Sequence, residues 1–177
     1  MMKGKNKSGG GANTTEHGKS FEDSYSLELV LLENGYTVEN GRVCRKSTYV
    51  GTITKQSSFY SSFLGVKEKD IRKEFGKVMR PDTVFYNANN KTLYIIEKKF
   101  QSVRGSVDEK IQTCEYKLRY YNRIVWKYRN EDIKHVRYFY LLSEFFNKSE
   151  YEKVLHFIQD KGCDYYFEKI ELQSIGL

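Results

Sequence analysis

The chain has 177 residues, enough for one domain with a proper core but not comfortably for two. Hydrophobic residues make up 39% of it, yet no apolar stretch approaches the length of a transmembrane helix and no signal peptide is evident. These properties exclude an integral membrane protein, and we expect a cytoplasmic location with no membrane association.

The formal net charge is +7, and tyrosine and phenylalanine are abundant. A basic balance with interleaved aromatic residues suits a polyanionic partner such as DNA, although many soluble proteins are basic. The three cysteines are widely spaced and odd in number. They argue for reduced thiols and against a disulfide framework or a zinc site.

Residues 1–18 are rich in Gly, Asn and Lys and contain almost no apolar side chains. This composition predicts a flexible basic arm ahead of a single domain over residues 19–177. A bound polyanion or a partner chain would order the arm, and an arm without a function fits its composition equally well.

Four elements are expected next: a helix from about 20 to 34, strands over 36–39 and from 43 to about 54, and a helix over 67–78. Gly35 is the stop signal of the first helix, and Asn40-Gly41 is a strong hairpin turn. The segment 46–67 mixes basic residues with hydrogen-bonding side chains. It could contact groove edges of DNA, or it could be an edge strand and a loop.

The segment Arg80–Gln101 predicts a β-hairpin, because two runs of β-branched and aromatic residues flank a turn-forming Asn-Ala-Asn-Asn sequence. With a two-residue turn at Asn89-Asn90, Asp82 lies directly opposite Glu97, with their Cβ atoms roughly 5 Å apart. A four-residue turn would leave the pair diagonal on the same face, and a three-residue turn would break the arrangement. Lys99 points the same way as Glu97, roughly 7 Å along the strand.

Two opposed carboxylates repel each other unless a cation lies between them. A divalent ion and the Lys99 ammonium would fill that role. Oxygen ligands of this kind suit Mg²⁺, which takes one or two carboxylates and keeps several waters. A solvated, charged strand end is the alternative interpretation of the same residues.

Pro81-Asp82, a spacer and then Glu97-Lys98-Lys99 resemble the signature of the PD-(D/E)xK nuclease superfamily, which includes many Type II restriction endonucleases. The resemblance covers roughly residues 15–145 and implies an α/β fold with a restriction-endonuclease-like αβββαβ core, a mixed central sheet flanked by helices. It implies that Asp82 and Glu97 bind Mg²⁺ through their side chains and Lys98 through its main-chain carbonyl. Lys99 would orient or deprotonate the attacking water.

The same resemblance adds two residues to the candidate site. Glu22 lies in the first turn of the first expected helix, from which an acidic residue often joins the metal site in this superfamily. An ordinary first-turn acid, favoured by the helix dipole, is the alternative. Gln101 follows Lys99 on the same face and is a candidate helper, as in members that read ExKxQ.

A long helix is expected from Ser106, which forms a capping box with Glu109. Its apolar stripe should pack on the sheet that carries the site. The stripe consists of Val107, Ile111, Cys114, Leu118, Tyr121 and Val125. A central strand over 136–143, a helix over 150–160 and a last strand over 164–172 complete the domain.

The polar face of this long helix carries Gln112, Tyr116, Arg119 and Arg123. Gln112 and Tyr116 fit a QxxxY pattern seen in the recombination-exonuclease branch of the superfamily. The two arginines favour phosphate contact. A solvated polar face without a function is the alternative.

The first hypothesis is a Type II restriction endonuclease that cuts double-stranded DNA at a short palindrome, as a homodimer whose two-fold axis matches the site. A cognate DNA methyltransferase is expected to accompany it. The second is a repair or recombination nuclease, either an exonuclease or a junction resolvase. The third is a catalytically idle DNA-binding protein or another basic protein. The candidate base-contacting residues are Lys55, Gln56, Ser57, Ser102 and Arg104.

Overall fold

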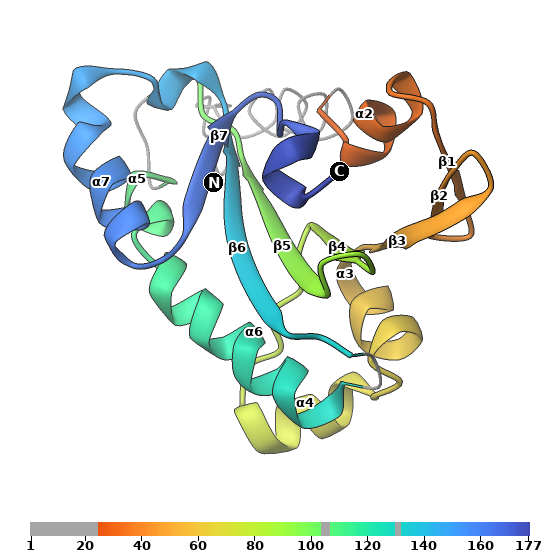
Figure 1. Ribbon diagram of the computed structural model, residues 1–177. Coiled ribbons are helices and arrows are strands. Elements are labelled where there is room, and N and C mark those ends of the chain that lie inside the picture. Colours follow the sequence, from red (N-terminus) through yellow and green to blue (C-terminus); the bar gives the residue numbers. More distant parts are fainter. Residues whose placement is uncertain (1–24, 104–106, 130–131) are drawn as a thin grey trace, which may run out of the picture.

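The computed structural model describes residues 25–103, 107–129 and 132–177. The basic arm, Glu22, Arg104 and Ser106 lie outside the described residues. Within these ranges the chain forms a seven-stranded mixed sheet with helices on both faces (Figure 1). The α/β class with a mixed, helix-flanked sheet is therefore confirmed. No helix within these ranges is long and apolar enough to cross a membrane.

The strands follow one another across the sheet in sequence order. They are β1 (Tyr36–Glu39), β2 (Arg42–Arg45), β3 (Thr48–Thr54), β4 (Thr83–Asn87), β5 (Thr92–Lys99), β6 (His135–Leu142) and β7 (Asp164–Phe167). Each neighbouring pair from β1 to β5 is antiparallel, whereas β5, β6 and β7 are parallel. The pairing thus changes from antiparallel to parallel at β5, the strand that carries Glu97 and Lys99.

The α-helices are α2 (Leu27–Glu33), α3 (Gln56–Ser58), α4 (Glu68–Phe75), α5 (Val107–Ile111), α6 (Cys114–Tyr128) and α7 (Glu152–Asp160). One π-helical turn, η1 (Phe59–Phe63), follows α3, and the 3-10 turns are η2 (Glu144–Phe146), η3 (Ser149–Tyr151) and η4 (Leu172–Ile175). In Figure 1, α6 and α4 lie together below the sheet, and α2 lies near the C-terminal end above it.

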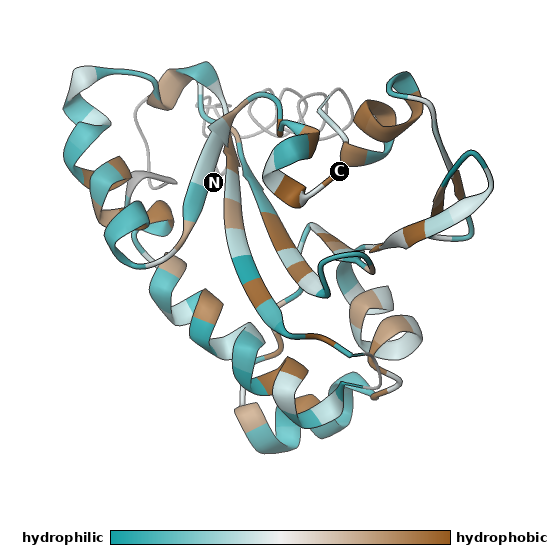
Figure 2. Ribbon diagram, in the orientation of Figure 1, coloured by the Kyte–Doolittle hydropathy of each residue, from teal (hydrophilic) through white to brown (hydrophobic). Residues whose placement is uncertain are grey.

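Alternation along the strands divides the core into two halves, one on each face of the sheet. On β5, Leu93 and Ile95 belong to the cluster that includes residues of η1, α4, α6 and α7. Tyr94 and Ile96 belong to the cluster that includes residues of α2 and η4. Figure 2 shows hydrophobic residues recurring along β5 and β6. Glu97 continues the series of Leu93 and Ile95 and therefore points to the α6 face.

The register of the β4–β5 hairpin agrees with the one predicted from the sequence. Thr83 pairs with Ile96 and Asn87 pairs with Thr92, so one further step places Asp82 opposite Glu97. The loop between the last paired residues has four residues, Ala88–Lys91, centred on the predicted turn dipeptide, which is why the register is unchanged. The Asn87 side-chain oxygen accepts main-chain bonds from Asn89, at 2.9 Å, and Asn90, at 3.3 Å.

Two expected elements are each divided in the structure. The strand predicted over 43–54 is two strands, β2 and β3, which reverse at Lys46-Ser47 with φ of 46° and 65°. These residues lack the Asn-Gly signal that marks such turns in sequence. The long helix predicted from Ser106 is interrupted between α5 and α6, where the Thr113 hydroxyl and the Tyr140 hydroxyl both donate to the Lys110 carbonyl, at 2.7 and 3.2 Å.

Three expected elements are shorter than predicted. The helix expected over 67–78 is α4, which ends at Phe75 because Gly76 adopts a φ of 78°. Within the described residues the first helix begins only at Leu27, because Ser26 is extended and its hydroxyl caps the Leu29 N–H at 3.3 Å. The last strand ends at Phe167, since Glu168 adopts a φ of 56° that a strand cannot continue through.

Asn87 ties the hairpin to the end of the chain, because its buried side-chain amide donates to the Ile175 and Gly176 carbonyls at 2.7 and 3.0 Å. We expect Asn87→Ala to lower the free energy of unfolding by about 3 kcal/mol, since several buried groups lose their partners together. Urea denaturation measures this change. The exposed neighbour Asn89 is the control, and Asn89→Ala should change the same quantity by less than about 0.5 kcal/mol.

Candidate active site

Asp82 lies immediately before β4, at the end of the hairpin ladder. Its Oδ2 accepts a hydrogen bond from the main-chain N–H of Lys98, at 2.8 Å. The carboxylate thereby occupies the place that a strand carbonyl would take if the ladder continued. This bond holds Asp82 against β5 at Lys98, the residue that follows Glu97.

Glu97 forms a nearly buried cluster with two lysines. Its Oε1 accepts from Lys99 Nζ at 2.9 Å and from Lys117 Nζ, on α6, at 2.7 Å. The exposed fractions of the three side chains are 11% for Glu97, 18% for Lys99 and 17% for Lys117. We call these three residues the Glu97 cluster. It joins β5 to α6 through charged groups that have little access to water.

The charges around Glu97 decide its protonation state. Burial of the carboxyl acts to raise its pKa, but the adjacent Lys99 and Lys117 ammonium groups outweigh burial and hold the pKa of Glu97 below its ordinary value. Glu97 is therefore ionised at neutral pH. Burial raises the pKa of Tyr121 on α6, and the charges of Glu97 and Asp82 add to that rise. Both carboxylates thus lie within electrostatic reach of one phenol on the α6 face.

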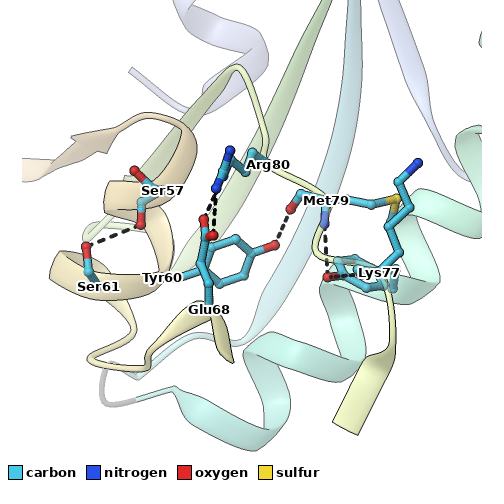
Figure 3. Close-up of polar contacts among 8 residues, drawn as sticks. Ser57, Tyr60, Ser61, Glu68, Lys77, Met79 and Arg80 are labelled. Carbon is cyan, nitrogen blue, oxygen red and sulfur yellow. Dashed lines mark hydrogen bonds and ion pairs between the residues drawn. The ribbon is translucent and has the colours of Figure 1, made fainter. Parts of the chain in front are cut away.

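Two tyrosines hold the main chain that leads to Asp82 (Figure 3). The Tyr60 hydroxyl, from η1, donates to the Met79 carbonyl. The Tyr120 hydroxyl, from α6, donates to the Lys77 carbonyl at 3.0 Å and accepts from the Met79 N–H at 3.2 Å. Since both tyrosines are buried, this approach to the strand is fixed by the core on the α6 face.

Two further contacts hold the residues that adjoin Asp82. Arg80 forms a bidentate pair with Glu68 of α4 (Figure 3). Both nitrogen–oxygen distances are 2.7 Å. The Gln56 N–H donates to the Pro81 carbonyl at 2.8 Å. Gln56 does so with a φ of 46°, a conformation that non-glycine residues adopt at a cost.

A cleft of about 360 Å³ lies beside Asp82 on the side of α2. Two of the residues predicted to contact DNA, Lys55 and Gln56, line this cleft together with Asp82 and Glu28. Lys55 pairs with Glu28 at 2.6 Å. The remaining lining residues are Ser26, Leu29, Thr83 and Lys98. The structure thus brings the candidate contact residues Lys55 and Gln56 to the same opening as the first candidate metal ligand.

The other predicted residues are placed in different ways. Gln101 is buried, and its main-chain N–H and carbonyl bond to the Ser143 hydroxyl at 3.1 and 3.0 Å. Arg119 pairs with Glu115 at 2.7 Å, and the Arg123 guanidinium lies 5.6 Å from the Phe75 ring centroid, so both arginines have partners within the protein. The remaining four candidates are exposed: Ser57, Ser102, Gln112 and Tyr116.

Sequence reasoning did not identify Lys117 or Glu28. Lys117 lies between Cys114 and Tyr121 at helical spacing, so it falls on the stripe that packs against the sheet. A lysine on an otherwise apolar stripe is the signal that could have identified it, because a buried ammonium needs a nearby carboxylate. Glu28 is the acidic residue in the first turn of α2, where the helix begins in the structure.

The donor set near Asp82 and Glu97 suits Mg²⁺ in kind. Both side chains offer carboxylate oxygens from neighbouring strands, and Mg²⁺ commonly takes one or two carboxylates while its other ligands are waters or substrate oxygens. Among the described residues, no group of three or more His, Cys, Asp or Glu is placed to hold a metal ion. A metal here would therefore depend on these two carboxylates, the Lys98 carbonyl, water and substrate.

No model of a known protein family and no curated protein matches this chain. What the Glu97 cluster and Asp82 can do therefore follows from their own chemistry. Carboxylates can hold a divalent cation, and ammonium groups can stabilise negative charge on a phosphate.

We expect Glu97→Gln to lower the free energy of unfolding by about 3 kcal/mol, because two nearly buried ammonium groups would lose their counter-charge. Urea denaturation at pH 7 measures the change. Glu115 is the matched control, since it also pairs with two cations, Arg119 at 2.7 Å and Lys161 at 3.2 Å, but in a more exposed position. Glu115→Gln should lower the free energy of unfolding much less than Glu97→Gln, and equal losses at the two positions would contradict the importance of burial.

Proposed function

We propose that this protein is a Mg²⁺-dependent endonuclease that hydrolyses phosphodiester bonds of double-stranded DNA at a short specific site, in the manner of a Type II restriction enzyme. The observation that carries the proposal is the hairpin register, which aligns Asp82 with Glu97 and leaves Lys99 bonded to Glu97 at 2.9 Å. These are the three residues that resemble the PD-(D/E)xK signature.

The order of elements supports the same proposal. Helix α2 precedes the antiparallel strands β3, β4 and β5, and helix α6 then leads to β6, which pairs in parallel with β5. This is the order of an αβββαβ core. Strands β1 and β2 at one edge, and α7 with β7 at the other, would be additions to that core.

In this proposal the residues of the chain have distinct roles. Asp82 and Glu97 would hold the cation through their side chains, and Lys98 through its main-chain carbonyl. When bound, Mg²⁺ would supply an activated water, neutralise charge at phosphorus and assist the leaving oxygen. Lys99 would orient the water and stabilise the negative charge that develops on the phosphate. Gln101 would assist from its position beside Lys99.

The choice of DNA as substrate rests on charge and on the cleft beside Asp82. The chain carries a net charge of +7, and Lys55 and Gln56 line the opening that contains Asp82. A homodimer would present two such sites, one for each strand of a palindrome. A DNA methyltransferase in the same system would protect the host sequence.

Plasmid DNA incubated with the protein and Mg²⁺ should give discrete fragments, and sequencing should find one common sequence at their ends. EDTA should stop the reaction. Progressive loss from free ends would instead support an exonuclease, and selective nicking of branched DNA a junction resolvase. If the protein bound DNA but cut it with none of the divalent cations tried, it would be a catalytically idle DNA-binding protein.

Asp82→Ala, Glu97→Ala and Lys99→Ala should each slow cleavage by at least about a hundredfold while DNA binding survives, because each removes either a ligand of the cation or the ammonium that acts on the water and the phosphate. Cleavage is measured by plasmid linearisation and binding by gel shift in Ca²⁺. Circular dichroism at the assay temperature establishes that each variant is folded, and Glu115→Ala is the surface control. Near-normal cleavage by any of the three would overturn the site assignment.

A further inference from the structure

The Glu97 cluster contains one more ammonium group than its carboxylate requires. Lys99 and Lys117 reach the same oxygen, Glu97 Oε1, at 2.9 and 2.7 Å. Their side chains are only 18% and 17% exposed. Removing a second ammonium from water costs free energy that a single shared carboxylate offsets only in part. Joining a helix to a strand does not by itself account for this cost, so we expect a further role for the second ammonium.

Lys117 is also the member of the cluster that comes from a different element. Lys99 lies two residues from Glu97 on β5 and keeps its place through the strand. Lys117 reaches Glu97 from α6, and its ammonium lies 5.9 Å from the Tyr140 ring centroid. The lysine stem has four carbons with free rotation, so its ammonium can move several bond lengths without any change in the helix.

A cation bound by Glu97 would meet Lys117 at close range. A magnesium ion lies about 2.1 Å from a carboxylate oxygen, which would place it within about 5 Å of an ammonium on the same carboxylate. Like charges at that separation repel strongly when water is largely excluded. The Lys117 ammonium and the cation are therefore competitors for Glu97.

We propose that Lys117 is a positioning residue that occupies Glu97 in the metal-free protein, weakens cation binding there, and turns to the DNA phosphate when cation and substrate enter together. This inference rests on the proposed nuclease function and deepens it. It assigns to Lys117 the coupling between cation binding and DNA binding. A cation alone has to displace an ammonium, whereas a phosphodiester offers that ammonium a new partner.

The test is Lys117→Met, which keeps the length and apolar stem of the side chain and removes its charge. Glu97 keeps Lys99 as a counter-charge, so the variant leaves no buried carboxylate without a cation. Without DNA, Mn²⁺ binding followed by the electron paramagnetic resonance of free Mn²⁺ should be about tenfold tighter than in the unsubstituted protein. Plasmid cleavage should need less Mg²⁺ for half its maximal rate, and that maximal rate should fall about tenfold or more.

Lys127→Met is the matched control, because Lys127 lies on the same helix and pairs with Glu74 at the surface. It changes the net charge equally and should alter neither Mn²⁺ affinity nor cleavage. Lys117→Arg retains the charge and should keep the weak Mn²⁺ binding. Unchanged or weaker Mn²⁺ binding by Lys117→Met, with an unsubstituted protein that binds Mn²⁺ and cuts DNA, would overturn this inference alone. An unsubstituted protein that neither binds Mn²⁺ nor cuts DNA would overturn the proposed function as well.

Discussion

Paired strands cannot slip by one residue without turning every side chain to the opposite face of the sheet. In β4 and β5 such a slip would move Leu93 and Ile95, which are fully buried on the α6 face, to the α2 face, and would turn Glu97 into the apolar core there. The hydrophobic residues of the hairpin thus fix where its charged residues lie. Asp82, just before one strand, and Glu97, near the end of the other, are aligned because the residues between them are packed.

Packing against α6 adds what the hairpin cannot supply. The strand pair aligns two acids and one lysine. The second lysine of the Glu97 cluster, Lys117, comes from α6, which begins at Cys114, 15 positions after the last residue of β5. The same helix supplies Tyr120, which holds the approach to Asp82, and Tyr121, whose pKa the charges of Glu97 and Asp82 help to raise. One face of α6 therefore serves the core and the candidate site together.

The hairpin could be predicted from sequence because its signals are local: β-branched and aromatic runs, with an asparagine-rich turn between them. The Asn40-Gly41 turn was equally evident, and both of its residues have positive φ, 50° and 81°. The reversal at Lys46-Ser47 was missed because its residues carry no turn signal. The break ahead of α6 depends on the Tyr140 hydroxyl, 30 residues away, and no local pattern reports it.

The residues of the candidate site also divide into those with a local sequence signal and those whose role depends on distant residues. Asp82, Glu97 and Lys99 could be placed together from strand alternation alone. Lys117 could not, since its role needs the packing of α6 on β5, and neither could the pairing of Lys55 with Glu28 across 27 residues. The contact of Arg123 with the Phe75 ring is likewise one that only the fold determines. The charged residues of the hairpin can therefore be predicted from the local sequence, whereas the residues that contact them from other elements depend on the tertiary structure.

The bond from Asn87 to the Ile175 carbonyl spans 88 residues of sequence. As the chain leaves the ribosome, the turn that sets the strand alignment is complete long before the carbonyls that secure it have been synthesised. Contacts of such long range slow folding, because the intervening loop must close before they contribute. In a growing chain, the alignment of Asp82 with Glu97 would therefore rest on the pairing within the hairpin until Ile175 has been made.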